Sequence, residues 1–198
     1  MFVLTMDQRG SRTSSDRVPA FLADLAEIPT VLPFERSVGD EVQGLLDSAE
    51  AVVEVSMRAL RAGHWYVGIG VGEVGLPLPH SSREASGGAF VAAREAVERA
   101  KKTGERVPLS VKSPKDDAEA AAAEAVLVLV GDLVRRRSAS EWRVLDALNS
   151  TGRRQIDVAR ALGISPQAVS KAILRSGWQE ERNGRAAAAL LLQMAGDR

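Results

Sequence analysis

Two aspartates stand at the ends of predicted strands, where their carboxylates could bind a cation. Asp7 follows the apolar run from Phe2 to Met6, which predicts a buried strand. Asp40 lies in a Gly39-Asp40 turn between two further predicted strands, the arrangement of a β-hairpin. Carboxylate oxygens are hard ligands that suit Mg²⁺, and this ion could hold the phosphates of a nucleotide. A lone carboxylate pair is a weak metal signal, and the alternative is that both aspartates only cap turns.

A second set of polar side chains belongs to a pattern typical of DNA-binding proteins. Ala159 is followed four positions later by Gly163, as the close crossing and the positive-φ turn of a helix-turn-helix require. Ser165 could cap the second helix, and Pro166 in its first turn has no amide proton to leave unpaired. The residues predicted to contact bases and phosphates are Arg154, Ser165, Gln167, Ser170, Lys171 and Arg175.

The apolar residues around this motif fit a three-helix core. Those expected at inward positions are Trp142, Val144, Leu145, Leu148, Val158, Leu162, Ile164, Val169 and Ile173. A generic helical bundle, or a helix-turn-helix that binds protein, is the alternative interpretation. Just upstream, the run from Arg135 to Arg137 could contact phosphates or could form a solvated helix end that complements the helix dipole.

The elements that would position these residues divide the chain into two parts. The first part has the order β-α-β-β-α-β-α-β, which indicates an α/β (α+β) sandwich of the palm or ferredoxin-like type. A long Ala-rich helix is predicted from Asp116 to Arg137, and four short helices follow it without a strand. We therefore expect an α/β domain over residues 1–113, a linker helix over 114–138 and an all-α helix-turn-helix domain over 139–198.

Composition and charge narrow the class of protein. The 198 residues include no cysteine, which excludes disulfides and thiolate metal sites. No signal peptide or membrane span is expected, because the apolar runs are too short, so the sequence predicts a cytoplasmic protein without membrane contact. Residues 135–198 carry 12 Lys or Arg against 6 Asp or Glu, while residues 1–134 carry 14 against 20. A basic end on an acidic body is typical of a nucleic-acid-binding tail.

Four segments of the first half resemble the landmarks of class III nucleotidyl cyclases, relatives of GGDEF-type and polymerase palm domains. They are MDQRGS from Met6, FERSVGDE from Phe34, VGIGVGEV from Val67 and GAFVAARE from Gly88. The resemblance covers about residues 2 to 100. It implies a metal site at Asp7 and Asp40 and a nucleotide site formed by Arg36, Gly39 and Arg94.

One position departs from the cyclase pattern. Phe90 stands where these cyclases place a catalytic Asn, so only Arg94 of an Asn–Arg pair remains. This departure favours a pocket that senses a nucleotide over one that converts it.

The two halves together resemble the SatD family of bacterial proteins. The segments GDEVQGLL, WYVGIGVGEV and GGAFVAAREAVERA carry this likeness. The leading hypothesis is a homodimeric, sequence-specific regulator that binds double-stranded DNA and whose N-terminal domain senses a nucleotide-type ligand, with Mg²⁺ as a candidate cofactor, or dimerises. The alternatives are a cyclase-like nucleotide-processing enzyme that the helix-turn-helix localises, and a dimerising scaffold with neither activity. Enzymatic activity is left open, with Phe90 arguing against it.

Overall fold

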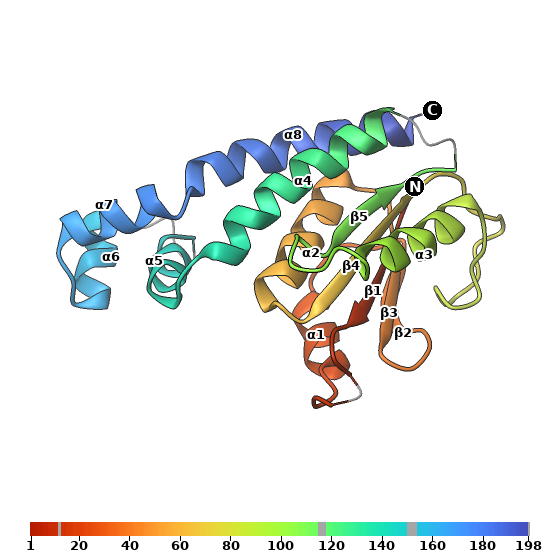
Figure 1. Cartoon of the computed structure of the whole chain (residues 1–198), viewed down its shortest axis with the longest axis horizontal. Helices are drawn as coiled ribbons and strands as arrows, with labels where there is room; N and C mark the ends of the chain where they lie inside the picture. The colour runs from red at the N-terminus through yellow and green to blue at the C-terminus, as the bar shows by residue number, and fades with distance from the viewer. Residues whose placement is uncertain (12, 115–117, 150–153, 198) are drawn as a thin grey trace.

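A five-stranded mixed sheet forms the centre of the N-terminal part of the molecule (Figure 1). The computed structural model describes residues 1–11, 13–114, 118–149 and 154–197. The strands are β1 (Phe2–Gln8), β2 (Leu32–Arg36), β3 (Glu41–Leu46), β4 (Trp65–Val71) and β5 (Leu109–Lys112), in the order β2-β3-β1-β4-β5. β1 is antiparallel to β3 and β4, and β5 is parallel to β4. The α/β class of the fold is thus confirmed.

Helices pack on both faces of this sheet. The helices on one face are α1 (Val18–Leu25), α2 (Ala49–Ala62), α4 (Ala118–Arg136) and α8 (Trp178–Gly196). α3 (Gly88–Ala100) packs on the other face. Alternate residues of β1 explain the division, because Leu4 joins the first core and Val3 the second. Helices and strands follow one another along residues 1–112 in the predicted order.

Three short helices lie at one end of the molecule, away from the sheet (Figure 1). They are α5 (Ala139–Asn149), α6 (Gln155–Leu162) and α7 (Pro166–Arg175), and we call them the head. Val144, Val158 and Val169 are buried together in a core that the head does not share with the sheet. α4 leads into the head and α8 leads out of it.

The C-terminal helix returns from the head to the sheet. Ala188 and Leu192 of α8 belong to the same hydrophobic core as Phe2 and Val71. The segment predicted as a separate domain over 139–198 therefore contributes its last helix to the core of the sandwich. The predicted division at residues 113 and 138 stays a prediction.

The Ala-rich helix and its partner α8 are the longest helices of the described residues. α4 is described from Ala118, and its predicted start at Asp116 lies outside the described residues. In the part of the chain that the structure describes, no helix combines the length and the apolar character that crossing a membrane requires.

Glycines of β4 allow α3 to approach the sheet closely. A Cβ atom on Gly68 would overlap the backbone of Ala93 and Val97, and one on Gly70 would overlap the backbone of Ala89 and Ala93. The sequence left open whether these glycines admit a ligand or a helix, and the structure places a helix there.

Replacing Gly70 by Ala should therefore destabilise the sandwich strongly. The atoms in the way belong to the α3 backbone, so the expected loss in the free energy of unfolding reaches or exceeds the upper end of the usual range of about 1–3 kcal/mol for overpacking. Gly44→Ala is the matched control, since the atoms nearest its Cβ belong to the Phe34 side chain, which can shift more easily than a helix backbone. Urea unfolding of both variants measures the difference, and equal losses would contradict the close-packing explanation.

Candidate functional site

The turn between α6 and α7 has the geometry that the sequence predicts. Gly163 adopts the left-handed conformation with φ of 65°, and its amide bonds back to the carbonyl of Ala159. The Ser165 hydroxyl accepts a hydrogen bond of 3.1 Å from the Ala168 amide, and Pro166 opens α7. These contacts fix the direction in which α7 leaves the turn.

The head turns a polar row outward. Val169 of α7 packs inward against Val158 and Val144, so the opposite side of the helix faces solvent. The exposed residues on and near α7 include the whole predicted DNA-contact set of Arg154, Ser165, Gln167, Ser170, Lys171 and Arg175. Of these, Ser165 already serves as the helix cap, and Arg154 pairs with Asp157 at 3.2 Å.

One residue of this face was not predicted from the sequence. Leu174 is 79% exposed and follows Gln167, Ser170 and Lys171 at helical spacings of seven, four and three. An apolar side chain in such a row can contact the methyl group of thymine. The same i, i+3, i+4, i+7 spacing in the sequence could have identified it.

The arginines of the basic run before the head, residues 135–137, lie in different surroundings. The Arg137 side chain is 1% exposed and forms an ion pair with the buried Glu181, while its Nε donates to the Ser176 carbonyl at 2.9 Å. Arg136 is exposed and pairs with Asp132. Neither sequence-based interpretation of the run holds for Arg137, which is neither a solvated end nor free to contact phosphate.

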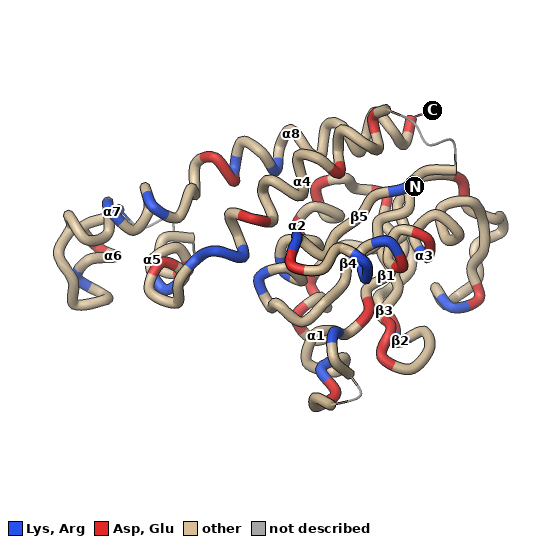
Figure 2. The backbone as a smooth tube through the Cα atoms, in the orientation of Figure 1, with Lys and Arg blue, Asp and Glu red and all other residues tan. Residues whose placement is uncertain are grey.

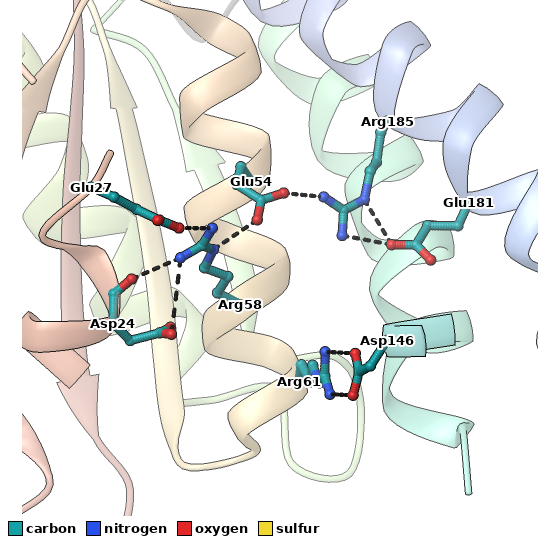
Figure 3. Close-up of polar contacts among 8 residues, drawn as sticks. All are labelled: Asp24, Glu27, Glu54, Arg58, Arg61, Asp146, Glu181 and Arg185. Atoms are coloured by element: carbon teal, nitrogen blue, oxygen red, sulfur yellow. Dashed lines mark hydrogen bonds and ion pairs between the residues drawn. The ribbon is translucent and has the colours of Figure 1, made fainter. Parts of the chain in front are cut away.

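Ion pairs tie the head and α8 to α2 (Figure 3). Arg61 of α2 donates two hydrogen bonds to the Asp146 carboxylate of α5, at 2.8 and 2.7 Å. The Arg61 guanidinium also lies 3.9 Å from the ring centre of Trp142, and that of Arg137 lies 4.8 Å from the same ring centre. The head is therefore held against α2 by polar and cation–π contacts, together with the packing of Trp142 against the core of the sandwich.

Glu54 is the centre of a second bridge, between α2 and α8. Its carboxylate accepts hydrogen bonds from Arg58 at 2.7 Å and from Arg185 at 2.5 Å, and Arg185 also donates to Glu181. Burial raises the pKa of Glu54, but the Arg58 hydrogen bond and the positive charge of Arg185 outweigh it and hold the pKa below its ordinary value. Glu54 is thus ionised at neutral pH and sustains the bridge.

These bridges border an open cavity of about 1730 Å³. Side chains of α1, α2, α5 and α8 line it, among them Arg17, Arg58, Trp142, Asp146 and Arg182. Arginines and carboxylates occur there in similar numbers, so the lining favours neither sign of charge.

The other candidate site lies where β1 ends and β3 begins. Asp7 stands opposite Glu41 in the sheet, and Asp40 directly precedes Glu41. The Lys101 ammonium at the end of α3 lies 2.9 Å from the Asp7 carboxylate and 2.7 Å from that of Glu98. We call Asp7, Glu41 and Lys101 the strand-end cluster, which Asp40 borders as the residue before Glu41.

Lys101 was not predicted as a site residue. The sequence places it at the end of a helix, where it suits the helix dipole. It also lies seven residues after Arg94, on the same side of α3, and this spacing is the only sequence signal for its position.

The charges of the strand-end cluster act on Glu41. Burial raises the pKa of Glu41, as does the charge of Asp7, while the hydrogen bond from Ser37 and the charges of Arg94 and Lys101 oppose the rise. The predicted residue Arg94 is therefore electrostatically part of this site. Its predicted partner Arg36 instead donates to the Gly39 carbonyl at 2.7 Å and pairs with Asp16, which ties the β2–β3 hairpin to the start of α1.

The predicted Mg²⁺ site fits the strand-end cluster only in part. Within the described residues, no three His, Cys, Asp or Glu side chains are close enough to hold a metal ion. At Asp7 the Lys101 ammonium supplies the positive charge that a metal would bring. Binding of Mg²⁺ by Asp7 and Asp40 therefore remains a proposal.

Phe90 lies in the hydrophobic core between α3 and the sheet. It is 8% exposed and packs with Val3, Leu32 and Leu45. At the position where the cyclase pattern has Asn, the chain thus has an apolar side chain that packs in the core.

No protein-family model, curated protein or solved structure matches the chain. The resemblance to class III cyclases and to the SatD family accordingly depends on the sequence segments alone. Function is inferred from the head and the strand-end cluster.

Removing Arg137 should destabilise the fold far more than removing its neighbour. Arg137→Leu leaves the buried Glu181 carboxylate without one of its two arginine partners, and the expected loss in the free energy of unfolding is about 3 kcal/mol. Arg136→Leu removes an exposed ion pair and should change it by about 0.5 kcal/mol or less. Thermal and urea unfolding measure both, and similar small effects would show that Arg137 does not secure the junction.

Proposed function

We propose that the chain is a sequence-specific DNA-binding transcription regulator. The observation that carries the proposal is the arrangement of α6 and α7: a left-handed turn at Gly163, a capped second helix and an outward polar row. A helix held by its apolar side against two others, with polar side chains opposite, fits the major groove of double-stranded DNA.

The positions of the polar side chains suggest their roles. Gln167 lies in the first turn of α7, the part of a recognition helix that reaches base edges. Lys171 and Arg175 lie one and two turns further on, where their charges would pair with phosphates. Arg154 would contact the backbone from the start of α6, and Ser170 would lie between the base-reading and phosphate-contacting residues.

The sandwich would serve as the sensing or dimerising part of a cytoplasmic homodimer, as in the SatD-type hypothesis. A nucleotide could place its phosphates against Lys101 of the strand-end cluster and against Arg94, whose charge acts on Glu41. Mg²⁺ held by Asp7 and Asp40 would neutralise those phosphates. Arg36 and Gly39, which are hydrogen-bonded to each other at the β2–β3 turn, would border the same site.

A cyclase-like enzyme is the less favoured function. Its supporting observation is the cluster of Asp7, Glu41 and Lys101 at one end of the sheet. The buried Phe90 offers no hydrogen bond where the cyclase pattern has Asn, so this cluster supports ligand binding better than turnover.

Loss of two cations from α7 should weaken DNA binding while the fold persists. Lys171→Ala with Arg175→Ala removes two phosphate contacts, so the slope of log affinity against log salt should fall by about 2. Arg83→Ala with Lys102→Ala removes the same charge from exposed positions of the sandwich and should leave the slope unchanged. Fluorescence anisotropy with duplex from the protein's own promoter region measures both.

Selection from random duplex provides the test of sequence specificity. The full chain should enrich one motif, and Gln167→Ala should relax the preference at one position of it. Absence of any enriched motif would contradict the regulator proposal.

Nucleotide with Mg²⁺ should raise the melting temperature of the chain by mass action. The shift should shrink in Asp7→Asn, which removes a carboxylate of the strand-end cluster, and persist in Asp47→Asn, which alters an exposed aspartate after the other end of β3. Thermal-shift assays with ATP and GTP measure this.

Absence of a shift with both nucleotides would leave the sandwich as a dimerising body. Formation of a cyclic nucleotide by the unaltered chain, and its loss in Asp40→Asn, would favour the enzyme.

A further inference from the structure

The N-terminal half of α4 and the C-terminal half of α8 lack the charges that a solvent-exposed helix face normally carries. From Ala120 to Gly131 the only charged residue of α4 is Glu124. Its carboxylate turns toward β5, where it accepts a 2.6 Å hydrogen bond from the Val111 amide. From Ala186 to Gly196, α8 has no charged residue at all, and Figure 2 shows this half of the helix in tan.

Large apolar side chains are exposed on this same face. Leu129 of α4 is 70% exposed, and Leu190 and Met194 of α8 are 63% and 46% exposed. Helical spacing aligns Leu129 with Ala122 and Ala125, and aligns Leu190 with Ala186 and Ala187. We call these residues the α4–α8 face.

The apolar character of this face requires a partner. The sheet side of the same helices is already filled, since Leu127 and Leu192 are fully buried in the core of the sandwich. A helix that covers a core on one side normally presents polar residues on the other, and a helix that is apolar all round is normally buried all round. Contiguous exposed apolar surface of this kind marks a contact site.

We infer that the α4–α8 face is the contact between two copies of this chain. The helices lie side by side and run in opposite directions, as the approach of Gly177 to Leu133 and of Gly184 to Val130 shows (Figure 1). Two ridges with a groove between them can pack on an identical pair related by a two-fold axis, which yields a four-helix bundle. The inference identifies the contact surface of the homodimer that the proposed function includes, and it rests on the proposal that the chain is a homodimer.

The size of the face is appropriate for such a contact. The apolar stretches have 12 residues in α4 and 11 in α8. At about 1.5 Å per residue each is about 17 Å long, and two helices about 10 Å apart present an apolar face on the order of 350 Å². A standard interface buries about 800 Å² per partner, so this face would form the apolar centre of such a contact, and the polar side chains around it would form the rim.

The charges at the edge of the face argue against a membrane surface as the occupant. Helices that lie on membranes carry Lys and Arg beside their apolar stripe. Here neither residues 120–131 of α4 nor residues 186–196 of α8 include Lys or Arg, and the edge at the Met194 end presents Gln193 and Asp197. The exposed Arg136 and Arg182 lie beyond these stretches, toward the head. A neutral, symmetric contact with a second copy fits these residues better.

Sedimentation equilibrium of the full chain without DNA tests the inference. The unaltered chain should be a dimer at micromolar concentration, and Leu129→Glu or Leu190→Glu should raise the dimer dissociation constant by about tenfold or more. Leu174→Glu and Val91→Glu are matched controls, because these residues are 79% and 61% exposed elsewhere and their change should leave the dimer intact. Circular dichroism checks that every variant folds.

Cysteine cross-linking gives an independent readout, because the natural chain has no cysteine. Leu190→Cys should form a covalent dimer on mild oxidation far faster than Leu174→Cys. The inference would be overturned if the unaltered chain stayed monomeric up to submillimolar concentration. It would also be overturned if the chain formed a dimer that both glutamate variants leave intact, since the dimer contact would then lie elsewhere. Since no DNA is present, failure of the dimer is distinct from failure of DNA recognition.

Discussion

The buried ion pair between Arg137 and Glu181 is the interaction on which the arrangement of the head depends. It joins the end of α4 to the first turns of α8, at the place where the chain enters and leaves the head. Removing two charges from water is costly, and the cost is offset only when both groups keep further partners. Glu181 keeps Arg185, and Arg137 keeps the Ser176 carbonyl and the Trp142 ring.

From this pair, a chain of charges runs to the sandwich. Arg185 connects Glu181 to Glu54 on α2, and Arg61, one turn beyond Arg58 on the same helix, binds Asp146 of α5. Apart from the packing of Trp142 against the core, the connection is polar and borders an open cavity, so it is weaker per unit area than a fully packed apolar interface. A change in the packing of the sandwich can therefore reach the head through α4, α8 and these side chains, provided that the two head positions differ in their affinity for DNA.

The sequence predicts the features that depend on local chemistry. The turn at Gly163, the cap at Ser165 and the order of strands and helices in the sandwich follow from periodicity and from backbone preferences, and the structure has them. Features that depend on distant segments were missed. Arg137 looks like a solvated helix end until Glu181 is brought to it, and Lys101 looks like a dipole partner until the sheet places Asp7 beside it. The return of α8 to the sheet is likewise invisible in its own sequence, because an alanine-rich helix packs equally well on several surfaces.

The pairing of Asp7 with Lys101 determines which ligand the strand-end cluster can accept. A free cation would have to displace the ammonium from Asp7, and a free anion would have to compete with both Asp7 and Glu98 for Lys101. The first exchange leaves Lys101 with Glu98 as its partner, and the second leaves the half-buried Asp7 carboxylate without its ammonium partner, at a cost. In the proposed function, a metal–nucleotide complex would replace both partners together, with Asp7 facing the metal and with Lys101 and Arg94 facing the phosphates. Charge balance would then favour the complex over either of its components as the ligand of the proposed sensor.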